Sequence, residues 1–490
     1  MSHTLLRLFF IVILVLAPYH SYASTWLSGL KATYSDIKKK LNTENETLAG
    51  NVLVFPESSP EGWVYSYFQE PVFNSKMAIL QAGLQHQESI LLLHGLGQLG
   101  MQDWYSVIPF LTTKYHVIAV DLPGFGYSQK PEGRYSPTRY ADVINAVSEK
   151  YSTGKFTLVG HSMGGAVSLR FASMYPDAIE KIILVDVAGI LHKTAFIKSA
   201  VQYNIDEKKS PEKLKNIVSQ VSDFGGSLVE LISTNVVSDT IQESKLAWSM
   251  IKGSPNTNAA VSLIEENFSL VLPEISVETF IIWGAEDNVA PLRTAKILKQ
   301  QIKGATLSVI DGAGHVPMKS HNELFLKHLS AALDGTVTKK AIIESRVNKG
   351  DLICENLNNQ KYSGQYNKVY INNCSNVQLI DFSAKQLLIT DSLVTAENIT
   401  IKSDHSALIT TESVVNITNG HIHTQEAIKL SGSRLDAAGL NIVAHENSII
   451  GDISSKLVFS VSHIKDKFYQ GHVHGAYSLK NQSIAQKLTE

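Results

Sequence analysis

The chain has 490 residues, which is longer than one ordinary domain, so two or three domains are expected. Its formal net charge of -2 offers no basic surface to a polyanion, and a nucleic-acid partner is therefore not expected. With 44% apolar and 18% charged residues, the chain can build sizeable cores and is not expected to be disordered over long stretches.

The N-terminus has the pattern of an export signal. Arg7 precedes the apolar block Leu8 to Ala17, and Ser21-Tyr-Ala23 places small residues at the -3 and -1 positions of a cleavage site. We interpret residues 1–23 as a signal peptide and expect an exported protein, either periplasmic or secreted. A retained membrane anchor is the alternative, although the apolar block has about half of the ~20 residues that a spanning helix needs.

Short aliphatic runs alternate with amphipathic stretches between residues 63 and 335. The runs are 90–93, 117–120, 156–159, 182–185, 280–282 and 307–310. Continuous apolar runs of this length, separated by helical patterns, are typical of parallel strands buried on both faces. We therefore predict an α/β domain over 63–335, preceded by a lead segment, 24–62. Strands are absent between about 190 and 272, where segments such as 211–221 and 240–252 indicate the helices of an inserted cap.

A repeat begins beyond residue 340. Its four copies follow one another at nearly equal steps and are Asp391-Ser-Leu-Val394, Glu412-Ser-Val-Val415, Gly432-Ser-Arg-Leu435 and Ser454-Ser-Lys-Leu457. Ile399, Ile422 and Ile442 recur at similar intervals. A period of about 20 residues with short strands predicts a right-handed parallel β-helix over 340–480. A β-sandwich is the alternative, because irregular strand-rich sequences can imitate a weak period.

The two cysteines, Cys354 and Cys374, are separated by the length of one predicted coil. Equivalent positions in neighbouring coils should stack about 4.8 Å apart, within the range of Cα separations that a disulfide accepts. Because export leads to an oxidising compartment, we predict a Cys354–Cys374 disulfide that closes the first coil.

The stretch Gly160-His-Ser-Met-Gly-Gly165 follows the apolar run 156–159 directly. A strand that ends at Val159 and a helix that begins near Met163 leave only a sharp turn for Ser162. Ser162 is therefore expected to have a strained backbone and to present its Oγ above the sheet edge. Gly160 and Gly164 are expected to be small because side chains would collide across that turn.

A serine hydroxyl becomes an effective nucleophile when a base takes its proton and an acid orients that base. Asp287 and His315 each follow a predicted strand after the cap, so we expect both at the sheet edge that carries Ser162. Asp186, which follows the run 182–185, is a rival candidate for the acid.

Five other residues near strand ends receive an expected role. The backbone N–H groups of Leu96, in the glycine turn after the run 90–93, and of Met163 are candidates for an oxyanion hole. His94 and His161 are expected to make structural hydrogen bonds, and Asp121 is expected to order the loop after its strand.

These segments, taken together, resemble the α/β-hydrolase superfamily, in its group of capped esterases and lipases. The matching motifs are His94-Gly-Leu-Gly97, Asp121-Leu-Pro-Gly-Phe-Gly-Tyr-Ser128, Gly160-His-Ser-Met-Gly-Gly165, Trp283-Gly-Ala-Glu-Asp287 and Gly312-Ala-Gly-His-Val-Pro317. The chain order Ser, Asp, His is also that of the superfamily. Relatives that open epoxides or remove halide use an aspartate nucleophile, which position 162 lacks. The resemblance does not extend to the C-terminal part of the chain, beyond residue 340.

The resemblance implies an esterase or lipase that forms an acyl-enzyme and needs no cofactor or metal. The expected partner is a small-molecule ester with an apolar acyl group. Apolar cap positions are expected to roof its pocket: Leu228, Leu231, Ile232, Trp248, Met250, Ile251 and Phe268.

Two other functions remain open at this point. The same triad serves carbon–carbon bond hydrolases and cofactor-free peroxidases. The β-helix is alternatively the functional centre, as a glycan-binding or cell-surface-binding module with an accessory hydrolase, while a spacer or oligomerisation role is its simplest interpretation.

Overall fold

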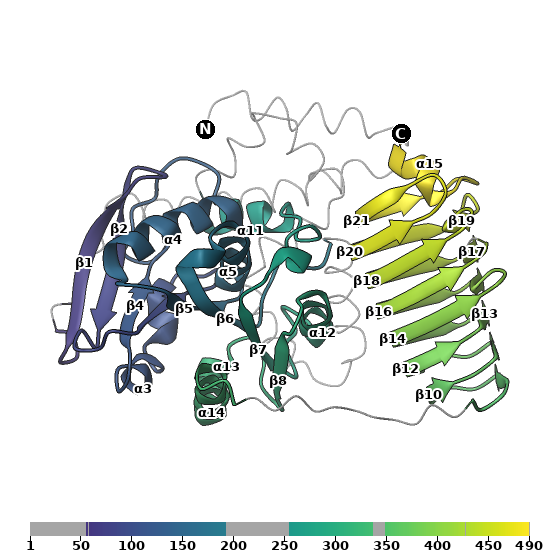
Figure 1. The fold of residues 1–490 in the computed structure, drawn as a ribbon, viewed down its shortest axis with the longest axis horizontal. Helices are drawn as coiled ribbons and strands as arrows, with labels where there is room; N and C mark the ends of the chain where they lie inside the picture. Colours follow the sequence, from purple (N-terminus) through teal and green to yellow (C-terminus); the bar gives the residue numbers. More distant parts are fainter. Residues whose placement is uncertain (1–54, 57, 193–253, 337–347, 427, 490) are drawn as a thin grey trace, which may run out of the picture. The chain divides into compact units, whose positions relative to one another are not determined.

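The computed structural model describes residues 55–56, 58–192, 254–336, 348–426 and 428–489 (Figure 1). The predicted signal peptide, most of the lead segment and most of the predicted cap, including 211–221 and 240–252, lie outside these residues. Within the described ranges, no helix has both the length and the apolar character needed to cross a membrane.

The first part of the chain contains a sheet of eight strands in the order β1-β2-β4-β3-β5-β6-β7-β8. The strands are β1 Trp63–Glu70, β2 Ser75–Ala82, β3 Ser89–Leu93, β4 His116–Val120, β5 Phe156–His161, β6 Ile179–Val185, β7 Glu278–Gly284 and β8 Thr306–Ile310. Strands β3 to β8 pair in parallel, whereas β2 is antiparallel to both β1 and β4. All six predicted strands are confirmed, while β1 and β2 were not predicted.

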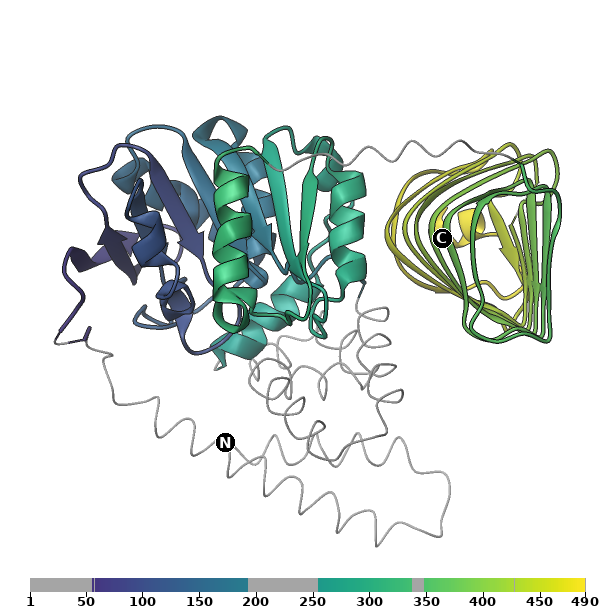
Figure 2. The ribbon, with the colours of Figure 1, turned by 90° about the horizontal axis from the view of Figure 1, so that it is seen from below.

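Helices cover both faces of this sheet (Figure 2). They are α3 Ile108–Leu111, α4 Pro137–Tyr151, α5 Met163–Met174, α11 Pro255–Ile264, α12 Leu292–Gln301, α13 Pro317–Ser320 and α14 Asn322–Leu333. Strand β3 shows why both faces are apolar: Leu91 and Leu93 belong to the core with α4, α5 and α12, whereas Ile90 and Leu92 belong to the core with α3 and α14. Each such buried side chain contributes roughly 1.5–3 kcal/mol to folding.

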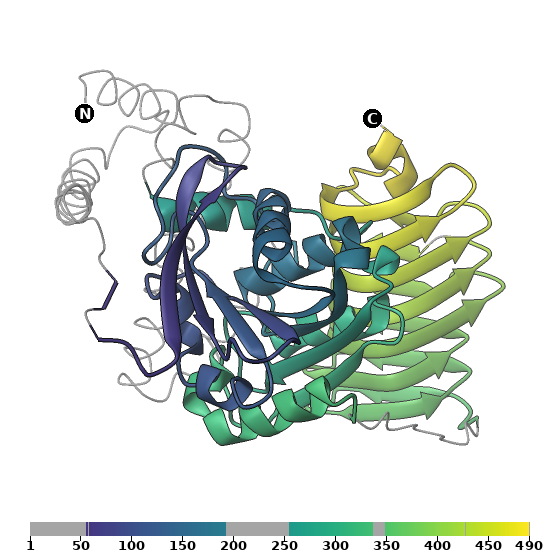
Figure 3. The ribbon, with the colours of Figure 1, turned by 60° about the vertical axis from the view of Figure 1, so that its left-hand side comes forward.

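The C-terminal part consists of coils that build two sheets, in the orders β10-β12-β14-β16-β18-β20-β21 and β19-β17-β15-β13-β11-β9 (Figures 1 and 3). The strands are β9 Leu352–Glu355, β10 Lys361–Gln365, β11 Lys368–Asn372, β12 Val377–Ala384, β13 Gln386–Thr390, β14 Leu393–Ser403, β15 Leu408–Thr411, β16 Val414–Thr424, β17 Ile428–Ser431, β18 Arg434–Ala444, β19 Ile449–Gly451, β20 Lys456–Lys465 and β21 Gln470–Ser478, followed by the helix α15 Ile484–Thr489.

From β9 to β20 the strands alternate between the two sheets, and neighbours within each sheet are parallel. In this part of the described chain, only the last pair of named strands, β20 and β21, is antiparallel. This arrangement agrees with the predicted parallel β-helix and not with a β-sandwich, whose sheets are antiparallel.

The register of β14, β16, β18 and β20 confirms the predicted repeat, since Leu393 pairs with Val414, Val414 with Arg434, and Arg434 with Lys456. The second predicted series was wrong at its first member. Ile422 pairs with Ile401, whereas Ile399 pairs with a glycine. Both isoleucines are buried, so spacing alone did not distinguish them.

The serine in each repeat is buried, and the serines of the first three copies link neighbouring coils. Backbone N–H of Ser392 donates to Oγ of Ser413 (3.1 Å), and N–H of Ser413 donates to Oγ of Ser433 (3.2 Å). Each of these three hydroxyls donates in turn to the carbonyl oxygen two residues earlier. The preceding positions, Asp391 and Glu412, have positive φ, as has the glycine of the third copy. The repeat therefore encodes a left-handed turn followed by a serine ladder.

The predicted disulfide between Cys354 and Cys374 is present, and both residues are buried. The register predicted for the two cysteines was wrong. Cys354 pairs with Ile371 and not with Cys374, so the first coil is shorter than the later ones. The two cysteines are not equivalent positions, and their Cα atoms lie 6.7 Å apart. The bond joins β9 to the turn that follows β11.

Replacing both cysteines by serine should lower the stability of the protein by about 3 kcal/mol, because the bond closes a loop of about 20 residues in the unfolded chain. Thermal unfolding of protein made in an oxidising compartment would measure this effect. Added reductant should lower the midpoint of the native protein and leave that of the double variant unchanged. Two alkylated thiols in the unreduced native protein would contradict the prediction.

Candidate active site

Ser162 occupies the sharp turn between β5 and α5. Its backbone has φ 52° and ψ -114°, and its N–H donates to the carbonyl oxygen of Val185 (2.9 Å). A Cβ atom on Gly160 would overlap the carbonyl oxygen of Gly164, and one on Gly164 would overlap the end of β3. The expected strain and the need for glycine at both positions are thus confirmed.

The three predicted triad residues lie within hydrogen-bond distance of one another. His315 Nε2 lies 3.0 Å from Ser162 Oγ, and His315 Nδ1 lies 2.8 Å from Asp287 Oδ2. Because Asp287 accepts at Nδ1, that nitrogen carries a proton and Nε2 is left to accept from the serine. The structure therefore brings the three side chains together in the geometry that proton transfer requires.

The loop after β7 holds the Asp287 carboxylate in place. Its Oδ1 accepts the N–H groups of Val289 (2.8 Å) and Ala290 (2.9 Å), which leaves Oδ2 for His315. Trp283 fixes the same loop, because its indole N–H donates to the carbonyl oxygen of Ala290 (2.9 Å). The Asp287 carboxyl group therefore faces the histidine with one defined oxygen.

His161 forms a hydrogen bond to the main chain of His315. Its Nε2–H donates to the carbonyl oxygen of His315 (2.7 Å), and the ring is buried. Burial, followed by the neighbouring His315, lowers the pKa of His161 to about 4. The structural role expected for His161 is thus found, but its partner, 154 residues away, was not predicted.

His94 and Asp121 order the loops after β3 and β4. The buried His94 accepts the N–H of Leu122 at Nε2 (3.0 Å) and donates from Nδ1 to the carbonyl oxygen of Gly95 (2.6 Å). Asp121 accepts the N–H groups of Met101 (2.6 Å) and Tyr127 (2.7 Å). Burial raises the pKa of Asp121 to about 7, although these two N–H groups lower it. Both predicted roles are borne out.

The two candidate oxyanion-hole residues belong to segments close to Ser162. Met163 is the first residue of α5, where a helix has free N–H groups and a positive dipole end. Leu96 lies in the loop after β3, and this loop is close to the serine: a Cβ atom on Gly95 would lie 3.0 Å from Ser162 Cβ. The next residue of the loop, Gly97, donates its N–H to Asn256 Oδ1 on α11 (3.2 Å).

Helix α11 also brings apolar side chains to this loop. Leu96 and Ile264 pack against the buried Ala260. Of the residues predicted to roof an acyl pocket, Phe268 alone is described, and it belongs to the main buried core. The other six lie outside the described residues.

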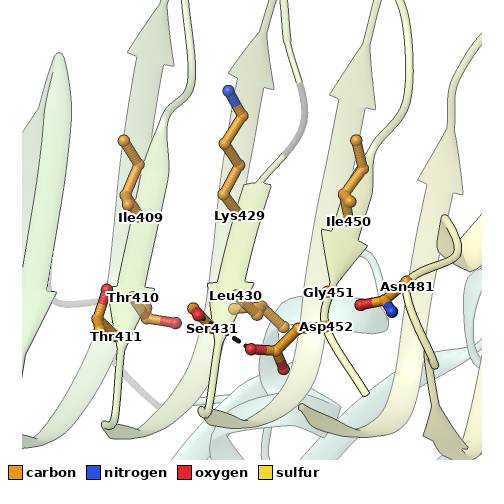
Figure 4. Close-up of a pocket in the computed structure, with 10 residues that line it drawn as sticks. All are labelled: Ile409, Thr410, Thr411, Lys429, Leu430, Ser431, Ile450, Gly451, Asp452 and Asn481. Carbon is orange, nitrogen blue, oxygen red and sulfur yellow. Dashed lines mark hydrogen bonds between the residues drawn. The ribbon is translucent and has the colours of Figure 1, made fainter. Parts of the chain in front are cut away.

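A separate cavity of about 330 Å³ lies on the coils (Figure 4). Strands β15, β17 and β19 and the segment near Asn481 line it, and Ser431 Oγ donates to Asp452 Oδ2 (2.9 Å) at its edge. None of the predicted site residues lines this cavity.

Residues 88–321 match the family model described as alpha/beta hydrolase fold. This segment belongs to the α/β hydrolase fold family. The segment covers the strands β3 to β8 and all three residues of the hydrogen-bonded set.

Curated relatives of this hydrolase segment differ in their names. Lipase 1 of Psychrobacter immobilis is 27% identical over 252 residues, which cover 50% of this chain and 76% of that protein. The 2-hydroxy-6-oxo-2,4-heptadienoate hydrolase of Pseudomonas putida is 26% identical over 243 residues, 49% of this chain and 86% of that protein. Among solved structures, a bacterial membrane phospholipase A matches with a TM-score of 0.44 and 23% identity, covering 69% of this chain and 100% of that one.

Replacing His161 by phenylalanine should make the stability of the protein less sensitive to acid. The pKa of His161 is lowered to about 4 in the folded state and is about 6.5 in an unfolded chain. Its contribution is therefore fully present above pH 6.5 and is lost as the pH falls towards 4. The native protein should lose roughly 3 kcal/mol more than the variant over this interval. Thermal unfolding midpoints measured from pH 7 to 4 provide the check, and parallel curves for the two proteins would disprove it.

Proposed function

We propose that the chain is an exported serine hydrolase that cleaves carboxylic esters through an acyl-enzyme on Ser162. The observation that carries this proposal is the hydrogen-bonded series from Ser162 Oγ through His315 to Asp287. Membership of the α/β hydrolase fold family supports a hydrolase, and the relative named as a lipase supports the ester class. Export is proposed from the sequence of residues 1–23 alone.

The proposed reaction has two steps on the same residues. Ser162 Oγ attacks the ester carbonyl carbon while His315 Nε2 takes its proton, and the N–H groups of Leu96 and Met163 stabilise the oxyanion. The tetrahedral intermediate collapses as His315 returns the proton to the leaving alcohol. Water then repeats the sequence on the acyl-enzyme and releases the acid. Asp287 stays ionised and stabilises the imidazolium in both steps.

We further propose that the acyl group is apolar. Leu96 and Ile264, packed on Ala260 beside the proposed oxyanion hole, offer an apolar surface there. An acyl chain with a carboxylate would lose part of its hydration against such an apolar surface.

Carbon–carbon bond hydrolysis is the second candidate, because one relative of similar identity is named as a hydrolase of a 2-hydroxy-6-oxo-dienoate. The same serine, base and oxyanion donors serve both reactions, so the site geometry alone does not separate them. A surface-binding role of the coils is a third, untested hypothesis. It differs from the others in requiring no nucleophile, so a Ser162→Ala variant would keep it.

A fluorophosphonate probe should label the native protein on Ser162, and the Ser162→Ala variant should not be labelled. Ser168→Ala is the matched control, since this buried serine on α5 donates to the Gly164 carbonyl oxygen and should remain dispensable for labelling. Intact-mass analysis and peptide mapping measure the label, and labelling of the alanine variant would refute Ser162 as the nucleophile.

Asp287→Asn should lower kcat by roughly 10⁴-fold, as expected for the loss of a triad aspartate.

A panel of esters with apolar or charged acyl groups, together with a 2-hydroxy-6-oxo-dienoate, should identify the substrate class. We expect kcat/KM to be at least about tenfold higher for short or medium apolar acyl esters, which is the effect of one or two buried methylene groups. Ile264→Asp should remove that preference, whereas Leu270→Asp, an exposed leucine just beyond α11, should not. Faster turnover of the dienoate than of every ester would favour carbon–carbon hydrolysis instead.

A further inference from the structure

A second buried carboxyl group lies beside the proposed triad acid. Asp186 follows β6 directly, is fully buried and has a left-handed backbone with φ 45°. Its Oδ1 accepts the backbone N–H of Gly284 (2.9 Å), at the end of β7. The Asp186 side chain therefore joins the end of β6 to the strand whose following loop carries Asp287.

The other oxygen, Asp186 Oδ2, is buried and receives no N–H donor from the described residues. Asp287 lies in the turn that Asp186 holds, because Gly284, whose N–H donates to Asp186 Oδ1, accepts the N–H of Asp287 at its carbonyl oxygen (3.3 Å). The negative charge of Asp287 therefore acts on the buried Asp186 carboxyl group. Asp287 already accepts two backbone N–H groups and the His315 ring. Two ionised carboxylates have acceptors only and would repel each other in this buried place. One proton between them removes the repulsion and supplies the missing donor.

That proton belongs on Asp186. Asp287 has three donors for its negative charge, whereas the described donors to Asp186 amount to the single N–H of Gly284. Burial, followed by the negative charge of Asp287, raises the pKa of Asp186 well above its usual range, and the Gly284 N–H opposes this only in part.

We propose that Asp186 is a positioning residue that stays protonated and donates its O–H to the Asp287 carboxylate, so that Asp287 keeps a fixed orientation towards His315. The Asp186 proton is not transferred during the reaction, and Asp287 remains the ionised partner of the histidine. This inference rests on the proposed function for the role of Asp287, but the protonation state of Asp186 does not depend on that function.

The first experiment compares the stability of the native protein and Asp186→Asn across pH. An unfolded aspartate titrates near pH 4. Above that pH the unfolded native chain releases a proton that folded Asp186 keeps, so the native protein loses stability as the pH rises. Asparagine has no such proton. The unfolding midpoint of the variant, relative to the native protein, should therefore rise steadily between pH 4 and 7. A relative midpoint that stays flat or falls over this range would overturn the proposal.

The second experiment measures kcat, KM and the rate of fluorophosphonate labelling. Asp186→Asn keeps a neutral donor of the same shape and should retain kcat within about threefold, whereas Asp186→Leu should lower kcat by about tenfold or more with little change in KM. Loss of activity in Asp186→Asn as large as that of Asp287→Asn would overturn the proposal and make Asp186 the ionised acid. If Asp186→Leu does not fold, the asparagine variant alone decides. An unlabelled native protein would refute the proposed function, whereas the dependence of stability on pH tests Asp186 separately.

Discussion

The turn at Ser162 is the constraint from which most of the first domain follows. A non-glycine residue with φ 52° and ψ -114° is strained, and it persists only where its surroundings determine it. Here the surroundings are a parallel strand on each side and a helix that starts at the next residue. The glycines at 160 and 164 are required because any side chain there would overlap the main chain or a neighbouring strand. The strain places the hydroxyl where the loops after β7 and β8 bring the acid and the base.

The buried ionisable groups around this turn divide into two kinds. His94 and His161 are neutral, because burial lowers the pKa of both rings. Their role is structural, since each makes hydrogen bonds to main-chain groups. Asp287 and His315 form the pair in which the proposed reaction creates and removes a charge. Because the His94 and His161 rings are neutral, neither opposes the imidazolium with a like charge, and this keeps the cost of each step small.

The sequence was sufficient for the parts that rest on local patterns and insufficient for those that rest on contacts between distant residues. The aliphatic runs predicted β3 to β8, and β3 to β7 are buried on both faces, whereas β1 has exposed and partly buried residues along its length and gave no such run. The triad was predictable because its members follow strands in a known order. The hydrogen bonds of His161 to the His315 carbonyl and of Asp186 to the Gly284 N–H join residues that are far apart in the chain, and no local pattern marks them. The cysteines show a third case: the bond was predicted, but its register was not, because the first coil is shorter than the repeat that follows it.

The serine ladder of the coils restricts how the C-terminal part can change in length. In this ladder the backbone N–H of one serine donates to the hydroxyl of the serine in the next coil. The hydroxyls of Ser413 and Ser433 donate in turn to a carbonyl oxygen of their own coil. The two contacts between coils span 21 and 20 residues, so the turns between strands can take up one residue, whereas an insertion of one residue within a strand would exchange its buried and exposed faces. An insertion of one whole coil would recreate the same contacts one step further along. This part of the molecule can therefore lengthen or shorten by whole coils of about 20 residues while the contacts of the serine ladder are kept.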